Sequence, residues 1–273
     1  MGRKRGDILL MEYNDDTILI PGLEFILGHF NEPLFPRTIS TKTTQGRQLV
    51  AYSKDEALAR FKQAIGLDCR IAAYPIYTDY YIKNTGISPH FLFIDLDAGL
   101  FGSPDSNSKI RLHRSLKKTL VNIQTKFNDQ SLQPSIIWSG NGYHIYLPVE
   151  AFVLEHEIVF SKYIDSNECS RKFMQFAERF LSNDKADECH WKGVSFKNCM
   201  LRVPGSINSK NNEQVRIIQH WNGTRPAINW LLRDYRRYLI QEVYIKPKIA
   251  RARRKSSLGS SKGKWFDYWR DNK

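Results

Sequence analysis

The sequence has few cysteines and no long hydrophobic run. Its four cysteines are widely spaced without a CxxC pair, which matches no standard redox or zinc pattern, so we expect free thiols. No apolar stretch approaches the roughly 18 to 20 residues that a membrane span requires. The basic start, Met1 to Asp7, is not followed by an apolar signal segment. We therefore expect a cytoplasmic protein that does not enter a membrane.

Acidic residues are absent from residues 246–264, which contain eight basic ones. The whole chain has 41 Lys and Arg against 28 Asp and Glu, a net charge of +13, so this stretch carries most of the excess and leaves about +5 elsewhere. Its Lys, Arg, Ser and Gly content provides too little apolar surface to fold alone. We predict a flexible basic linker with nucleic acid as its partner, the alternative being an extension that only improves solubility.

The linker separates two parts of different composition. Residues 1–245 are long and apolar enough to form a folded domain, with 41% hydrophobic residues in the whole chain. Residues 265–273 begin with four aromatic residues among five. This C-terminal peptide either docks on the domain or binds a partner and folds on contact.

Helices and strands are mixed along the chain, and no internal repeat is visible. Alternation around Asn14 to Asp16 predicts a hairpin over residues 8–20, and the polar stretch 37–50 predicts a loop or an exposed hairpin. A capping box of Ser53 and Glu56 and helical apolar spacing predict helices, and short apolar runs predict strands. The expected helices are 22–30, 53–65, 110–127, 168–181 and 226–240, and the expected strands are 70–74, 91–97, 134–138, 143–147 and 215–219.

The stretch from Phe91 to Asp97 is an apolar run that ends in two carboxylates one residue apart. In a strand, the side chains of Asp95 and Asp97 point to the same face, where they repel each other. Such a pair is stable if a cation lies between the groups, if one group is protonated, or if both remain in water. A hard divalent metal such as Mg²⁺ is the commonest solution, and a solvated strand end is the alternative.

Two turns further along carry polar and basic residues. Residues 139–142 form a glycine-rich turn before His144, and backbone N–H groups with a donor imidazole suit phosphate oxygens. In residues 201–210, Arg202 and Lys210 flank a turn of Pro, Gly, Ser and Asn that could hold a triphosphate. A structural histidine and a basic surface turn are the alternatives.

In this order, the three segments resemble the archaeo-eukaryotic primase superfamily, which includes primase small subunits and primase-polymerases. The family pattern is hydrophobic-Asp-hydrophobic-Asp, then a Ser-x-His type motif, then an acidic residue ahead of an Arg-Leu-Pro-Gly-Ser-like turn. The corresponding segments here are Ile94 to Asp97, Ser139 to His144, and Ala186-Asp187 ahead of Arg202 to Lys210. The resemblance extends over residues 70 to 220.

The resemblance implies an α+β fold in which a small N-terminal αβ module and an RRM-like antiparallel sheet flank the active-site cleft, with the acidic strand in that sheet. It implies a template-directed nucleotidyltransferase, a DNA primase or primase-polymerase, with residues 1–245 as the catalytic domain. Asp95, Asp97 and Asp187 would be catalytic and would bind two divalent metals, Mg²⁺ or Mn²⁺. The residues expected to contact the nucleoside triphosphate are Ser139, Asn141, His144, Arg202, Ser206, Asn208 and Lys210.

Several alternatives stay open. Asp184 or Glu188 could replace Asp187 as the third acidic ligand, because Asp187 lies farther from Pro204 than the family pattern leads us to expect. Asn208 stands where many primase small subunits have His.

Two other functions also stay open. A metal-dependent nuclease would use paired aspartates equally well, and a non-enzymatic replication-initiation module would bind DNA through the linker. Single-stranded DNA is the expected template, a helicase or a large primase subunit could be a further partner, and the protein would then act at a nucleoid or replicon.

Overall fold

The computed structural model describes residues 16–31, 34–76, 90–101, 106–150, 160, 162–164, 166–195 and 198–246. The chain divides into two compact units, residues 1–235 and 236–273. The predictions for the linker beyond residue 246 and for the aromatic peptide 265–273 lie outside the described residues. Among the helices that are described, none combines the length and the apolarity needed to cross a bilayer.

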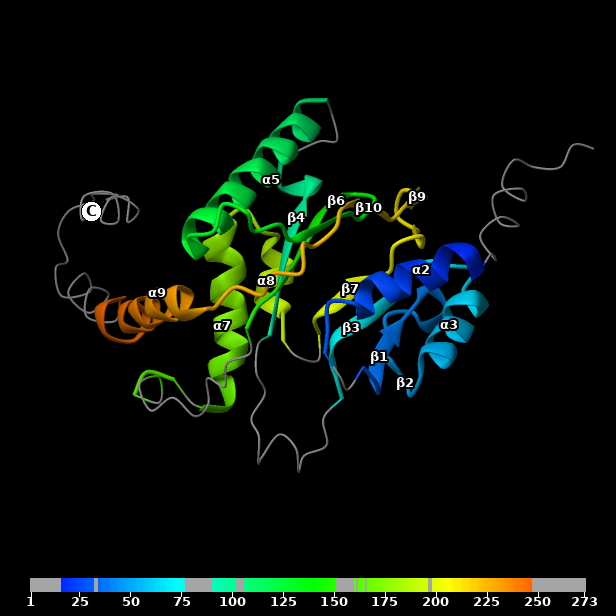
Figure 1. Cartoon of the computed structure of the whole chain (residues 1–273), viewed down its shortest axis with the longest axis horizontal. Coiled ribbons are helices and arrows are strands. Elements are labelled where there is room, and N and C mark those ends of the chain that lie inside the picture. Colours follow the sequence, from blue (N-terminus) through cyan, green and yellow to red (C-terminus); the bar gives the residue numbers. More distant parts are fainter. Residues whose placement is uncertain are drawn as a thin grey trace, which may run out of the picture. The chain divides into compact units, whose positions relative to one another are not determined.

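The first sheet combines three strands from the N-terminal part of the first unit with one from residues 200–202, and is antiparallel, with the strand order β2-β1-β3-β7. Its strands are β1 (Arg37–Ser40), β2 (Leu49–Ala51), β3 (Arg70–Pro75) and β7 (Met200–Arg202). The helices α2 (Asp16–Leu27) and α3 (Lys54–Gln63) lie beside this sheet, and the turn η1 (Lys42–Thr44) follows β1 (Figure 1). Leu23 and Phe61 of the helices share a core with Ile39 and Ile71 of the strands. The pairing of β1 with β2 confirms the hairpin alternative for residues 37–50.

Local signals place α3 correctly. The Ser53 Oγ accepts a hydrogen bond from the Glu56 N–H (3.2 Å), and the Glu56 carboxylate accepts one from the Tyr52 N–H (2.9 Å). The first bond satisfies a backbone donor that the first turn of a helix leaves unpaired, and the second fixes the residue before the N-cap. The buried face of α3, with Ala57 and Phe61, then packs into the core.

The hairpin predicted for residues 8–20 is wrong in its described part, because residues 16–20 belong to α2. The helix begins at Asp16 rather than at Gly22. Its buried residues Leu19, Leu23, Ile26 and Leu27 follow helical spacing. Pro21 lies inside the helix, although proline usually ends or kinks a helix because it lacks an N–H donor.

The second sheet is also antiparallel and has the strand order β10-β5-β6-β4. Its strands are β4 (Phe91–Asp97), β5 (Ser135–Trp138), β6 (Gly142–Pro148) and β10 (Arg216–Gln219). The helices α5 (Ser106–Phe127) and α7 (Ser166–Leu181) contact β4, and the turn η2 (Ala98–Phe101) follows it (Figure 1). The remaining elements are α8 (Glu188–Gly193), β8 (Ile207–Asn208), β9 (Glu213–Gln214), α9 (Asn229–Ile240) and a π-helical turn, η4 (Gln241–Ile245). Mixed helices and antiparallel sheets confirm the predicted α+β class.

His29 connects α2 to the second sheet. Its Nδ1 donates a hydrogen bond to the Phe25 carbonyl oxygen (2.8 Å), and its Nε2 lies 2.7 Å from the Ser135 Oγ in β5. The Ser135 Oγ accepts a hydrogen bond from the Trp221 N–H (2.9 Å), so its own proton is available to His29 Nε2. The contacts fit a neutral imidazole with its proton on Nδ1, the form that burial of His29 favours.

Acidification should destabilise the fold through His29. Burial lowers the pKa of this imidazole from 6.5 to about 4, so below pH 6.5 the unfolded chain binds a proton that the folded chain takes up only near pH 4. Stability is lost as the pH falls through this window, by about 2 kcal/mol between pH 7.5 and pH 5. Asp95 and His190, whose pKa values are raised, act in the opposite direction, so the contribution of His29 is the difference between the wild type and His29→Gln in urea unfolding at the two pH values. On acidification His29→Gln should lose about 2 kcal/mol less than the wild type, and equal changes in both proteins would contradict the assignment.

Candidate active site

Two carboxylates and an imidazole share one face of the second sheet. The register between β4 and β6 places Asp95 opposite His144 and Asp97 opposite Gly142, and directly opposite residues point to the same face. The His144 Nε2 lies 3.6 Å from the Asp95 Oδ1. Strand pairing therefore brings the first two sequence motifs together.

The turn between β5 and β6 approaches the end of β4 closely. The Ser139 N–H donates a hydrogen bond to the Gly142 carbonyl oxygen (2.9 Å), which closes the predicted turn. A Cβ atom at Gly142 would lie 2.2 Å from the Leu96 carbonyl oxygen, so only glycine fits there. This approach allows the Asn141 side-chain amide to donate a hydrogen bond to the Asp97 Oδ1 (2.7 Å).

The outer edge of β4 is held at Asp95. Its N–H donates a hydrogen bond to the Glu178 carboxylate of α7 (3.0 Å), and its carbonyl oxygen accepts one from the Asp187 N–H (2.8 Å). Glu178 is buried and also accepts a hydrogen bond from the His190 Nδ1 (2.7 Å). The Asp187 carboxylate accepts a hydrogen bond from the His190 N–H (3.1 Å) at the start of α8.

Of the three candidates for the third acidic residue, Asp187 is the one bonded to β4. Asp184 forms an ion pair with Arg179 (2.8 Å), and Glu188 forms one with Lys192 (2.5 Å). The side chains of both ion pairs are largely exposed. The contacts therefore favour Asp187 over its two neighbours as a site residue.

Negative charge is crowded around Asp95. Burial raises the pKa of Asp95 from 3.8 to about 7, and the nearby charges of Glu178, Asp97 and Asp187 add to the rise, while His190 opposes it. Burial disfavours the charged form of His190, but the negative charges of Glu178, Asp95 and Asp187 and the hydrogen bond to Glu178 together outweigh this and raise the pKa of His190 to about 9. A bound cation would relieve the repulsion among the carboxylates.

Within the described part of the chain, no three His, Cys, Asp or Glu side chains are arranged as a ready set of metal ligands. The Asp97 carboxylate accepts hydrogen bonds from Asn141 and from the Gly99 N–H (2.7 Å), and the Asp187 carboxylate caps α8. Nevertheless, the donor chemistry fits a hard cation, because carboxylate oxygens are the usual protein ligands of Mg²⁺. A cation bound here would replace the hydrogen-bond donors that now satisfy these oxygens.

The first sheet contributes two arginines to the same region. Arg70 of β3 lies opposite Arg202 of β7, and the Arg202 guanidinium lies 3.2 Å from an Asp68 carboxylate oxygen. Burial lowers the pKa of His144 well below 6.5, and the positive charges of Arg202, His190 and Arg70 lower it further. Both arginines are therefore close enough to His144 to influence its charge, so the acidic face of the second sheet and the basic end of the first meet at this imidazole.

Most of the other predicted nucleotide-binding residues lie where the two turns meet. The Asn208 side-chain amide donates a hydrogen bond to the Ser139 carbonyl oxygen (3.0 Å), and its Oδ1 accepts one from the Lys210 N–H (3.2 Å). Lys210 is exposed. Ser206 differs, because its hydroxyl is fully buried and donates to the Val203 carbonyl oxygen (2.6 Å) within its own turn.

Comparisons with known proteins give several similar solved structures, including the following three. The AEP domain of the cyanophage S-2L primase-polymerase has a TM-score of 0.45 and 9% identity, over 80% of this chain and 97% of that one. The catalytic domain of primase RepB′ in complex with initiator DNA has a TM-score of 0.40 and 15% identity, over 81% and 90%. Another structure of primase RepB′ has a TM-score of 0.46 and 14% identity, over 87% and 68%.

These are structures of the enzyme class that the sequence motifs resemble. No protein family profile and no protein of curated function matches the sequence.

Sequence reasoning missed Asp68, Arg70, Glu178 and His190, because none of them belongs to a motif. One signal for Glu178 was present. It is a charged residue at helical spacing from the buried apolar residues Met174 and Leu181 of α7, and the structure buries it with them. A carboxylate on the apolar face of a helix must have a buried partner, which here is the backbone of the acidic strand.

Proposed function

We propose that this protein is a template-directed nucleotidyltransferase, a primase or primase-polymerase that makes or extends primers on single-stranded DNA. The observation that carries the proposal is the convergence at His144, where Asp95 lies 3.6 Å from the imidazole and Arg202 and Arg70 approach from the other sheet. Carboxylates suited to divalent cations beside cationic groups suited to phosphates are what phosphoryl transfer requires.

Each group has a role in this proposal. Asp95, Asp97 and Asp187 would hold two divalent cations, Mg²⁺ or Mn²⁺, which supply activation of the primer 3′-hydroxyl and charge stabilisation on the triphosphate. Burial lowers the pKa of His144, which makes its imidazole a weak proton acceptor, so it would donate a ring N–H to a phosphate oxygen rather than act as a general base. The other proposed nucleotide contacts are Ser139, Asn141, Arg202, Asn208 and Lys210, whereas the buried Ser206 hydroxyl would stabilise the turn that carries Arg202 and Asn208. The basic linker 246–264 would add affinity for DNA.

A nucleotide-incorporation assay tests the proposal. The wild-type chain is incubated with a single-stranded DNA template, labelled ribo- or deoxyribonucleoside triphosphates, and Mg²⁺ or Mn²⁺. We expect template-dependent products that disappear when a chelator is added. Template degradation without nucleotide-dependent products would indicate a nuclease, and salt-dependent DNA binding with neither outcome would indicate a non-enzymatic replication-initiation module.

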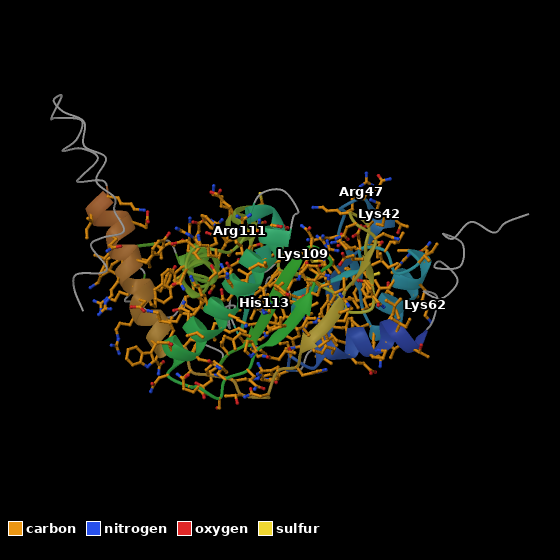
Figure 2. All side chains as sticks on the ribbon, turned by 90° about the horizontal axis from the view of Figure 1, so that it is seen from above. Lys42, Arg47, Lys62, Lys109, Arg111 and His113 are labelled. Carbon is orange, nitrogen blue, oxygen red and sulfur yellow. The ribbon has the colours of Figure 1, made fainter. Side chains whose placement is uncertain are left out.

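Exposed basic side chains offer a surface for the template. Lys42 and Arg47 lie between β1 and β2, Lys109 lies near the start of α5, and all three lie along the same edge of the view in Figure 2. α5 contacts η2, the turn that directly follows Asp97. The 22 residues of α5 include no Asp or Glu. A strand of DNA could therefore approach the acidic end of β4 over a positively charged surface.

Removing this charge should weaken template binding. The variant Lys42→Gln/Arg47→Gln/Lys109→Gln should bind single-stranded DNA with lower affinity and a shallower salt dependence, since each lost phosphate contact reduces the slope of log K against log salt by about 0.7. Fluorescence anisotropy with a labelled oligonucleotide at several salt concentrations measures the slope. Arg60→Gln, an exposed position on α3, is the control, and equal slopes for all proteins would exclude this surface.

A further inference from the structure

Arg70 has a buried nitrogen without a partner. Its Nε is inaccessible to solvent and makes no hydrogen bond, and it is one of three such side-chain atoms in the described part of the chain. A buried polar group left unpaired destabilises the folded state, and more so when the group is charged. A bound ion or ligand is one of the interactions that can satisfy such a group.

The surroundings of Arg70 point to an anion. Arg70 is directly opposite Arg202 in the pairing of β3 with β7, and like charges in this arrangement destabilise a sheet. Asp68 neutralises Arg202 at 3.2 Å, and its carboxylate also accepts a hydrogen bond from the Ser209 N–H (3.1 Å). Asp68 is therefore already engaged by other donors.

The nearest charges support the same conclusion. Burial lowers the pKa of Arg70, and Arg202 lowers it further, while Asp68, Asp95 and Tyr146 oppose the shift. Asp95 is thus within electrostatic range of Arg70, and the imidazole of His144 lies 3.6 Å from its carboxylate. Among the described residues, no ion pair joins Arg70 to a carboxylate, so Arg70 lies beside the acidic face without being neutralised by it.

We propose that Arg70, together with Arg202 and His144, forms a subsite for the terminal phosphates of the nucleoside triphosphate. The inference rests on the proposed nucleotidyltransferase function and adds to it a residue from outside every motif. A phosphate oxygen at this position would accept a hydrogen bond from the free Nε and would separate the charges of the two arginines. The planar guanidinium presents its donors in a geometry that matches phosphate. Cations held by Asp95 would lie beside the same phosphates.

A structural role for Arg70 predicts the opposite response to mutation. An arginine that stabilises the fold by pairing with Asp95 would lower the melting temperature when it is replaced. An arginine kept unpaired for a ligand costs stability in the free protein, so its replacement should leave the melting temperature unchanged or raise it. The two roles therefore differ in a measurement that needs no enzymatic activity.

Thermal unfolding with and without a nucleoside triphosphate and Mg²⁺ provides the test. Without nucleotide, Arg70→Gln should melt at or above the wild-type temperature. Its triphosphate Kd, obtained from the ligand-dependent shift in melting temperature, should rise about 10- to 100-fold, which is the usual effect of losing a hydrogen bond to a charged group. The triphosphate Kd of Arg70→Lys should lie between those of the wild type and Arg70→Gln, because lysine keeps the positive charge but lacks the planar guanidinium with its paired donors. The control Arg60→Gln, at an exposed position, should have the Kd of the wild type.

Three results would overturn the inference. One is that Arg70→Gln binds the triphosphate with the same affinity as the wild type. Another is a lower melting temperature without nucleotide, combined with equal losses of triphosphate and DNA affinity, which would make Arg70 structural. The third is a loss confined to single-stranded DNA affinity, which would assign Arg70 to the template. If the proposed function itself is wrong, the wild-type protein will show neither triphosphate-dependent stabilisation nor incorporation, and the subsite is then rejected with it.

Discussion

Replacing Asp97 with asparagine should reduce nucleotide incorporation at least about 100-fold while the protein stays folded. Asparagine preserves the shape of the side chain, and its amide oxygen can still accept the hydrogen bonds from Asn141 and the Gly99 N–H. It removes the negative charge needed to hold a divalent cation, whose stabilisation of the transition state amounts to several kcal/mol. Incorporation rates in Mg²⁺ and Mn²⁺, with thermal unfolding alongside, measure the two effects separately.

Asp184→Asn is the matched control for Asp97→Asn. Asp184 is an exposed aspartate whose carboxylate pairs with Arg179, so its replacement should leave incorporation close to the wild-type rate. A loss as large as that of Asp97→Asn would show that Asp184, rather than Asp187, is the third acidic ligand. Equal product from the wild type and from Asp97→Asn would refute the role of the acidic strand.

Substituting alanine for Gly22 should destabilise the protein by about 3–5 kcal/mol. A Cβ atom at this position of α2 would lie 1.9 Å from the Pro204 carbonyl oxygen. Overpacking usually costs about 1–3 kcal/mol, and a larger value is expected here because the neighbour is backbone and cannot rotate away. The displaced turn lies between Arg202 and Asn208, so triphosphate affinity should fall as well.

Urea unfolding of Gly22→Ala against Gly193→Ala measures this effect. Gly193 ends α8 and is exposed, and a Cβ atom added to it would project into open space among the described residues. Alanine at 193 should therefore be neutral or slightly stabilising. A Gly22→Ala protein as stable as the control would mean that α2 does not hold the turn in place.

Local features of the sequence predicted most of the elements. Ser53 and Glu56 marked the start of α3, and the glycines of residues 139–142 marked a turn, because capping bonds and turn geometry depend on neighbouring residues alone. The start of α2 was misplaced because local alternation around Asn14 to Asp16 predicted a hairpin, whereas the burial of Leu19 and Leu23 in a core assembled from distant segments favours a helix.

The candidate site was predictable only in part. The motifs supplied Asp95, Asp97 and His144, since strand alternation and a tight hairpin keep these residues together. The places of Arg70 and Glu178 in the site were not predictable, because they depend on which strand and which helix pack next to β4 and β6. That arrangement follows from the packing of the two sheets and from the pairing of β3 with β7.

The alternation of β4 limits how this strand can vary. Asp95 and Asp97 alternate with the fully buried Ile94 and Leu96, and all four are tied to β6 by a continuous register. Inserting or deleting one residue within the strand would exchange its two faces, sending both carboxylates into the apolar core. Insertions and deletions within β4 would therefore abolish the site. Only substitutions can change the chemistry of this strand.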